Sequence, residues 1–126
     1  MVVGSLRTEV RKELGDNEHE ADWIITHVTK MSQEEFIKNP REITDAEYEE
    51  IMNIVSRRNQ GEPLQYILGE TEFMGLVFKV NDDVLIPRQD TETLVEAVIK
   101  KIKDKKVRVL DIGTGSGCVG ISIAKF

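Results

Sequence analysis

Residues 107–117 read Val-Arg-Val-Leu-Asp-Ile-Gly-Thr-Gly-Ser-Gly, and this stretch decides the fold of the C-terminal part of the chain. Its first six residues are mostly apolar, which predicts a short, buried parallel β-strand. A glycine loop follows directly, and the apolar segment 119–124 predicts a helix packed on a sheet. Strand, glycine loop and helix in this order open a nucleotide-binding α/β unit. Because glycine lacks Cβ, a ligand can approach the main chain of such a loop closely.

The spacing of the glycines indicates which ligand the loop suits. A dinucleotide fingerprint is G-x-G-x-x-G, but Cys118 stands at its third glycine position. The string D-x-G-x-G-x-G resembles motif I of class I methyltransferases, which use S-adenosylmethionine. That cofactor has no pyrophosphate and carries a cationic sulfonium and an ammonium, so a carboxylate beside the loop suits it. The predicted cofactor-binding residues are Asp111, Gly113, Thr114, Gly115, Ser116 and Gly117. A purely structural turn is the alternative.

The first 60 residues predict a small bundle of four amphipathic helices. One apolar stripe consists of Leu6, Val10 and Leu14, and Gly15 offers a stop. Apolar residues at 21, 24, 25 and 28 have the spacing of a second stripe. A further stripe, on the helix that follows Thr44, consists of Tyr48, Ile51, Met52 and Val55.

Two capping boxes mark helix starts in this segment. Ser32 precedes Glu35 by three residues, and Thr44 precedes Glu47 by the same spacing. In such a box the hydroxyl accepts from a free N–H and the carboxylate accepts from the capping residue's own N–H. The helix after Ser32 should stop near Asn39, because the residue before a proline disfavours helical geometry.

After Gly61 the pattern changes from helical to extended. Apolar residues from 73 to 80 flank Gly75, which predicts a β-hairpin. A turn cluster at 81–83 and an extended Val84–Pro87 follow. The apolar spacing of residues 94–102 then predicts another amphipathic helix, with lysines near its C-terminal end.

Four segments, in order and with matching spacing, resemble the release factor glutamine methyltransferases of the HemK/PrmC type. They are Gly61–Gly69, Phe73–Phe78, Leu85–Glu92 and Asp111–Gly117. The resemblance implies an N-terminal domain that recognises a peptide chain release factor. It also implies N5-methylation of the glutamine in the Gly-Gly-Gln motif with S-adenosylmethionine as cofactor, and Arg88, Thr91 and Glu92 as loop supports.

The chain departs from this family in two ways. Gln89 stands where the family usually has proline, so the loop loses some stiffness. The N-P-P-Y motif, which by resemblance holds the substrate amide, does not occur in the sequence. We therefore expect the chain to be the N-terminal portion of an enzyme, without catalytic residues and inactive alone.

Composition excludes several other classes of protein. Residues 1–62 carry eight Lys and Arg against fourteen Asp and Glu, whereas 63–126 carry nine of each, so the whole net charge of −6 belongs to the first half. Such acidity disfavours nucleic-acid binding and suits either a solvated surface or a basic protein partner. No apolar run approaches the roughly 20 residues of a membrane span, and a cytoplasmic location is expected. His19 and His27 lack a ligand cluster, so no metal site is expected.

The sequence thus predicts an α+β chain with three parts. These are a helical substrate-recognition domain (1–70), a hairpin linker (71–86) and the incomplete start of a Rossmann-like methyltransferase domain (87–126). Two alternatives stay open: a dinucleotide-dependent enzyme, and a non-enzymatic helical interaction module with a vestigial nucleotide-binding segment. The oligomeric state is not predicted.

Overall fold

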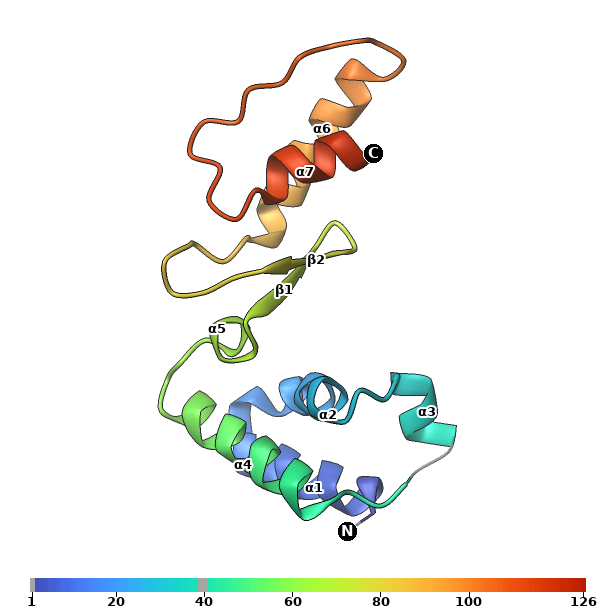
Figure 1. Cartoon of the computed structure of the whole chain (residues 1–126), viewed down its shortest axis with the longest axis vertical. Coiled ribbons are helices and arrows are strands. Elements are labelled where there is room, and N and C mark those ends of the chain that lie inside the picture. The colour runs from blue at the N-terminus through green and yellow to red at the C-terminus, as the bar shows by residue number, and fades with distance from the viewer. Residues whose placement is uncertain (1, 39–40) are drawn as a thin grey trace. The chain divides into compact units, whose positions relative to one another are not determined.

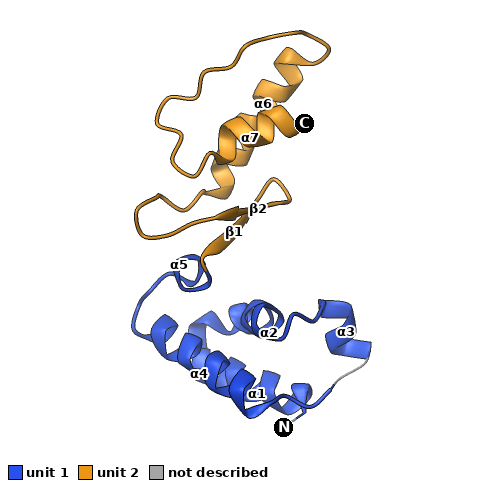
Figure 2. Cartoon of the chain, viewed as in Figure 1, with its two compact units in different colours: residues 1–68 blue, residues 69–126 orange. Residues whose placement is uncertain are grey.

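The computed structural model describes residues 2–38 and 41–126. The chain divides into two compact units, residues 1–68 and residues 69–126, each with its own apolar core (Figure 2). No helix in the described ranges combines the length and the apolar character that crossing a membrane requires.

Unit 1 is built from helices (Figure 1). In chain order they are α1 (Val3–Leu14), the 3-10 helix η1 (Gly15–Glu20), α2 (Ala21–Thr29), α3 (Gln33–Lys38), α4 (Asp45–Asn59) and α5 (Leu64–Leu68). The four predicted helices are confirmed. The short helices η1 and α5 were not predicted, since neither is long enough to show an apolar period. The predicted stop at Asn39 and Pro40 lies outside the described residues.

The predicted apolar stripes form the core of unit 1. Leu6, Val10, Ile24, Ile25 and Ile51 are each fully buried. The stripe of α4 is wider than predicted, because Ile54, which the predicted stripe left out, is also buried. Burial of these side chains is the main source of stability in so small a unit.

Polar contacts fix the helices of unit 1 at their ends. Arg58 donates to Glu20 at 2.7 Å and to Asn17 at 3.2 Å, which ties α4 to η1. Arg7 makes two hydrogen bonds to Asp22, at 2.8 and 3.2 Å, and so ties α1 to α2. Paired hydrogen bonds of this kind give more geometric specificity than a single ion pair.

Both predicted capping boxes are present. The Glu47 N–H donates to Thr44 Oγ1 at 3.2 Å, and the Thr44 N–H donates to Glu47 Oε1 at 3.2 Å. The Glu35 N–H donates to Ser32 Oγ at 3.1 Å, and the Ser32 N–H donates to Glu35 Oε2 at 3.3 Å. These contacts satisfy amides that the first helical turn leaves without a partner.

Replacing Thr44 by Ala is expected to lower the free energy of unfolding by about 1 kcal/mol, because the hydroxyl that caps α4 is lost. Thr44→Ser keeps the hydroxyl and serves as the control, with a change near zero. Urea unfolding followed by circular dichroism measures both. Equal losses in the two variants would show that the cap contributes nothing.

Glu47 also pairs with Arg41. The guanidinium donates to the two carboxylate oxygens at 2.7 and 2.9 Å. The Arg41 hydrogen bonds are the main cause that lowers the pKa of Glu47 from 4.5 to about 2, and the Thr44 backbone adds to the shift.

Stability is expected to depend on pH through Glu47. The pKa of Glu47 is lower in the folded chain than in the unfolded chain. Its stabilisation is therefore complete above pH 4.5 and is lost as the pH falls toward 2. Glu47→Gln keeps the capping geometry but not the charge. Unfolding curves of both proteins between pH 7 and 2 should converge at the acid end, and a constant gap would refute the assignment.

Unit 2 contains a hairpin and two helices: β1 (Glu70–Phe73), β2 (Leu76–Lys79), α6 (Gln89–Ile102) and α7 (Cys118–Lys125). The strands are antiparallel, with Phe73 opposite Leu76. The two turn residues between them, Met74 and Gly75, have φ of 52° and 73°. Positive φ at both central residues is the geometry of a type I′ hairpin turn, so the hairpin prediction is confirmed.

The core of unit 2 joins the hairpin to both helices. It consists of Phe73, Phe78, Val95 and Cys118, with the two rings edge to face at a centroid distance of 6.3 Å. Cys118 is a free thiol with 8% exposure. Cys118 is therefore a packing residue of the unit 2 core.

The predicted parallel strand is not a strand in this structure. Residues 107–111 form neither a helix nor a strand and belong to no ladder, and Leu110 and Ile112 are 82% and 86% exposed. The described sheet contains only β1 and β2. A parallel strand needs a hydrogen-bonded neighbour and helices over its faces, and the described ranges hold no other parallel strand. The expectation of a buried strand here is therefore wrong for this chain taken by itself.

Candidate functional site

The glycine loop connects the extended segment to α7. Gly113, Gly115 and Gly117 have φ of 71°, 57° and 83°, so every second residue is left-handed. Residues with a Cβ rarely adopt this region. Gly117 is the residue that caps the start of α7. The alternation of glycines in the sequence thus matches the alternation of backbone angles that the loop needs.

Asp111 ties the two ends of the loop together. Its Oδ2 atom accepts from Thr114 Oγ1 at 2.9 Å and from the Gly120 N–H at 3.2 Å. Gly120 lies in the first turn of α7, where backbone N–H groups lack helical acceptors and carry partial positive charge. The carboxylate therefore occupies the position at which a helix N-terminus would bind an anion.

Gly120 is a site residue that sequence reasoning missed. A Cβ atom at this position would lie 3.3 Å from Asp111 Oδ2. The residue is three positions beyond the last motif glycine, so the string of glycines gave no reason to include it. Its role depends on a contact across nine residues, which only the folded loop creates.

The outer side of the loop is open. A Cβ atom built on Gly113 or Gly115 would meet no atom within 4 Å. Gly113, Thr114 and Gly115 are exposed, whereas the Ser116 hydroxyl oxygen is buried and has no hydrogen-bond partner among the described residues. The backbone of the first half of the loop is thus accessible to a ligand.

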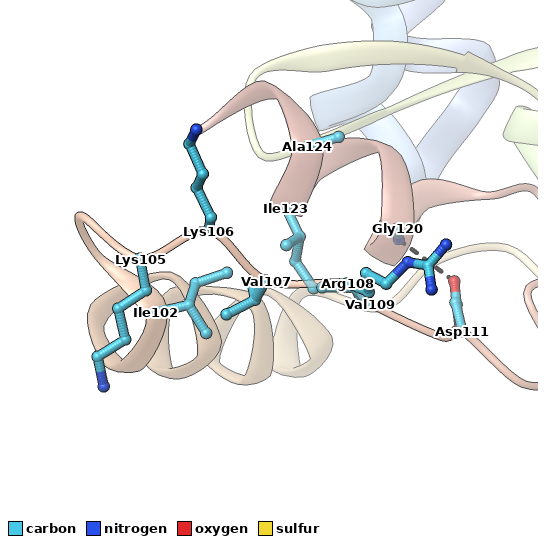
Figure 3. Close-up of a pocket in the computed structure, with 10 residues that line it drawn as sticks. All are labelled: Ile102, Lys105, Lys106, Val107, Arg108, Val109, Asp111, Gly120, Ile123 and Ala124. Atoms are coloured by element: carbon cyan, nitrogen blue, oxygen red, sulfur yellow. Dashed lines mark hydrogen bonds between the residues drawn. The ribbon is translucent and has the colours of Figure 1, made fainter.

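A hollow of about 640 Å³ is lined by residues from the end of α6, from the segment 105–111 and from α7 (Figure 3). It ends at Asp111 and Gly120, whose hydrogen bond Figure 3 draws as a dashed line. The apolar part of its lining is Ile102, Val107, Val109, Ile123 and Ala124, and the cationic part is Lys105, Lys106 and Arg108. The volume falls within the range typical of small-molecule pockets.

The residues predicted to support the loop, Arg88, Thr91 and Glu92, lie at the start of α6. The Arg88 carbonyl accepts from the Thr91 N–H at 3.1 Å, and Glu92 Oε1 accepts from the Met74 N–H at 2.9 Å. Glu92 therefore holds the left-handed turn of the hairpin against the first turn of α6. In the described ranges no hydrogen bond joins Arg88, Thr91 or Glu92 to residues 111–117.

No group of three or more His, Cys, Asp or Glu side chains in the described part of the chain could hold a metal ion. His19 is exposed and borders a hollow with Asp22 and Trp23 in unit 1. The lining of that hollow has one imidazole, of His19, and one carboxylate, of Asp22, and Arg7 already donates a hydrogen bond to this carboxylate.

The described part of the chain thus consists of a helical unit followed by a hairpin, a further helix and a glycine loop at the N-terminus of α7. The family model described as the PrmC N-terminal domain matches residues 6–69, which is half of the chain. The chain belongs to this family.

Curated relatives agree with the family match. A release factor glutamine methyltransferase of Coxiella burnetii is 42% identical over 107 residues, which are 83% of this chain and 39% of that protein. The protein of the same name from Thermodesulfovibrio yellowstonii is 40% identical over 120 residues, which are 93% of this chain and 43% of that protein. That of Flavobacterium psychrophilum is 54% identical over 76 residues. The chain spans about two fifths of the length of the first two relatives, and it is homologous to their N-terminal part.

Proposed function

We propose that the chain is the N-terminal part of a protein-glutamine methyltransferase that uses S-adenosylmethionine. Its substrate would be the glutamine of the Gly-Gly-Gln motif in peptide chain release factors. The homology to release factor glutamine methyltransferases supports the reaction and the substrate. The geometry of the glycine loop supports the cofactor.

One observation carries the choice of cofactor: the Asp111 carboxylate accepts from the Gly120 N–H at the start of α7. A dinucleotide enzyme places its pyrophosphate at this position. Here the position holds a carboxylate, which repels phosphate and attracts a cation. S-adenosylmethionine supplies a methyl group on a cationic sulfur, and its charge suits a loop that follows Asp111. The residues proposed to hold it are Asp111 and the backbone of 113–117.

The chain's own residues would do two things in this reaction. The loop presents the accessible backbone of Gly113–Gly115 to the cofactor, and Asp111 holds that backbone in place. The segment 107–112 would become a parallel strand once neighbouring strands covered its exposed apolar side chains. Methyl transfer to an amide nitrogen depends mostly on orientation, and the residues that orient the substrate amide are proposed to lie in sequence that follows this chain in the whole enzyme.

The three parts of the chain receive separate roles in this proposal. Residues 1–70 recognise the release factor, 71–86 link the parts, and 87–126 begin the methyltransferase domain.

The acidity of unit 1 supports a basic protein partner. Among the described residues of unit 1, six Arg and Lys side chains form ion pairs with six acidic side chains. This leaves a surplus of acidic side chains in residues 1–62.

The proposal is tested by titrating ligands and by assaying methyl transfer. Calorimetry with the whole enzyme should show binding of S-adenosylmethionine and no binding of NAD at the same concentration. Mass spectrometry of a release factor incubated with enzyme and cofactor should show one added methyl group on the Gly-Gly-Gln glutamine. The 126-residue chain should show no turnover. Binding of NAD instead of S-adenosylmethionine would refute the proposed cofactor. An unmethylated glutamine would refute the proposed substrate.

A further inference from the structure

We propose that a hollow on unit 1 binds an arginine side chain of the release factor, with the guanidinium stacked on the indole ring of Trp23 and paired with the carboxylate of Asp22. The hollow has a volume of about 510 Å³, and its lining comes from unit 1 alone. The release factor as the source of this arginine rests on the proposed function. The hollow itself is a feature of this chain.

The hollow lies where η1, α2 and the start of α3 meet. The helix α2 turns Ala21, Ile24 and Ile25 into the core of unit 1, and a different side of the same helix borders the hollow. The lining residues include His19 of η1, Asp22, Trp23 and Thr26 of α2, and Ser32 and Gln33 at the N-terminal end of α3. Because His19, Ser32 and Gln33 are exposed, the hollow is open to solvent.

Hydrogen bonds fix the wall that joins α2 to α3. The N–H of Met31, which also lines the hollow, donates to Thr29 Oγ1 at 3.4 Å. The Ser32 N–H donates to Glu35 Oε2 at 3.3 Å, and Ser32 Oγ accepts from the Glu35 N–H at 3.1 Å. The wall is therefore ordered before a partner arrives, and binding there costs little further ordering of the chain.

Trp23 and Asp22 give the hollow two groups that suit a guanidinium. The Trp23 side chain packs against the core of unit 1, which holds the ring in place, and tryptophan is the best aromatic partner for a cation. Asp22 accepts from Arg7 at 2.8 and 3.2 Å, but its side chain remains 26% exposed. A carboxylate has about four acceptor positions, so Asp22 can accept from a second guanidinium as well. Arginine suits this pair because its planar group both stacks on rings and pairs with carboxylates.

The charge of unit 1 favours a cation over other occupants. Among the described residues, no lysine or arginine lines the hollow, so it offers no side chain that would pair with an anion. The whole net charge of −6 belongs to residues 1–62, and such a field attracts a basic partner. The hollow thus combines an aromatic ring, an accessible carboxylate and a negative surrounding, as expected of a contact for a basic protein.

Calorimetric titration of the 126-residue chain with a purified release factor tests the hollow. Trp23→Leu is expected to weaken binding roughly five- to tenfold, with Trp23→Phe in between, because the cation–π contact is lost or reduced. Asp22→Asn should weaken binding roughly fivefold. The matched control is Glu62→Gln, which also removes one charge from an arginine–carboxylate pair of unit 1 and should bind within about twofold of the wild type. Circular dichroism checks that each variant is folded.

The single tryptophan gives a second, local readout that needs no substitution. Since Trp23 is the only tryptophan of the sequence, a ¹⁵N-labelled chain gives one indole N–H signal by NMR, and an unlabelled release factor gives none. We expect this signal to shift as the release factor is added. An indole signal that stays in place at saturation would overturn the inference. A signal that shifts with the concentration of the chain alone would show that a second copy fills the hollow, and would also overturn it.

The outcomes separate this inference from the proposed function. If Trp23→Leu and Asp22→Asn bound the release factor as tightly as Glu62→Gln does, the hollow would not be the docking site, while methylation by the whole enzyme would still support the proposed function. A wild-type chain that bound no release factor would overturn the inference in the same way. If the whole wild-type enzyme failed to methylate the release factor, the proposed function would be wrong and the named partner would fall with it.

Discussion

Replacing Ile51 by Ala is expected to lower the free energy of unfolding of unit 1 by about 2–4 kcal/mol, because it removes buried methyl groups and leaves a cavity. Ile51 is fully buried in the core of unit 1. A unit of this size has a total stability of only about 3–10 kcal/mol, so the variant should lose a large fraction of its stability and unfold at a lower urea concentration.

The chain offers a matched control for this substitution. Ile37 lies on α3 and is 71% exposed. Ile37→Ala makes the same chemical change on a helix and should alter stability by no more than about 0.5 kcal/mol. Urea unfolding followed by circular dichroism at about 222 nm compares the two. If both variants lost the same stability, α4 would not pack as the structure shows.

Replacing Gly115 by Val is expected to weaken S-adenosylmethionine binding to the whole enzyme by on the order of 100-fold or more, since a β-branched residue resists positive φ. Gly115 has φ of 57°. Because a Cβ there would touch no protein atom within 4 Å, the protein itself leaves room for the side chain. The effect therefore comes from backbone strain and from blocking the ligand.

Gly4→Val is the control for this prediction. Gly4 also has open space around its Cβ position, but it lies on α1 and has no positive φ. Calorimetric titration should show wild-type affinity for Gly4→Val and loss of binding for Gly115→Val. Thermal melting by circular dichroism checks that each variant is folded. If Gly115→Val bound the cofactor with wild-type affinity, the loop would be only a structural turn, and the cofactor assignment would be wrong.

Local signals predicted the helices and the hairpin because their causes lie within a few residues. The capping box of Thr44 involves residues three apart, and the hairpin turn at Gly75 depends on two positive φ angles. Apolar stripes predicted which side chains are buried, since each stripe follows from the helical period. Prediction was weakest where the period was too short to recognise, as in η1 and α5.

The candidate site was predicted only in part. The glycine string identified the loop, because glycine favours turns and a close approach of a ligand to the main chain. It did not identify Gly120, and it did not indicate that Glu92 accepts from the Met74 N–H of the hairpin turn at 2.9 Å. Both contacts join residues far apart in sequence, so no local pattern contains them.

The sequence by itself determined the local conformations: where helices start, where the chain turns and which glycines are left-handed. It also determined the family, through four motifs whose order and spacing are independent of the fold. Tertiary structure alone decided that Asp111 reaches the first turn of α7 and that the apolar segment 107–112 stays exposed. The physical reason is that a cap or a turn is stabilised within a few residues, whereas a strand and a closed loop exist only with a partner elsewhere in the chain.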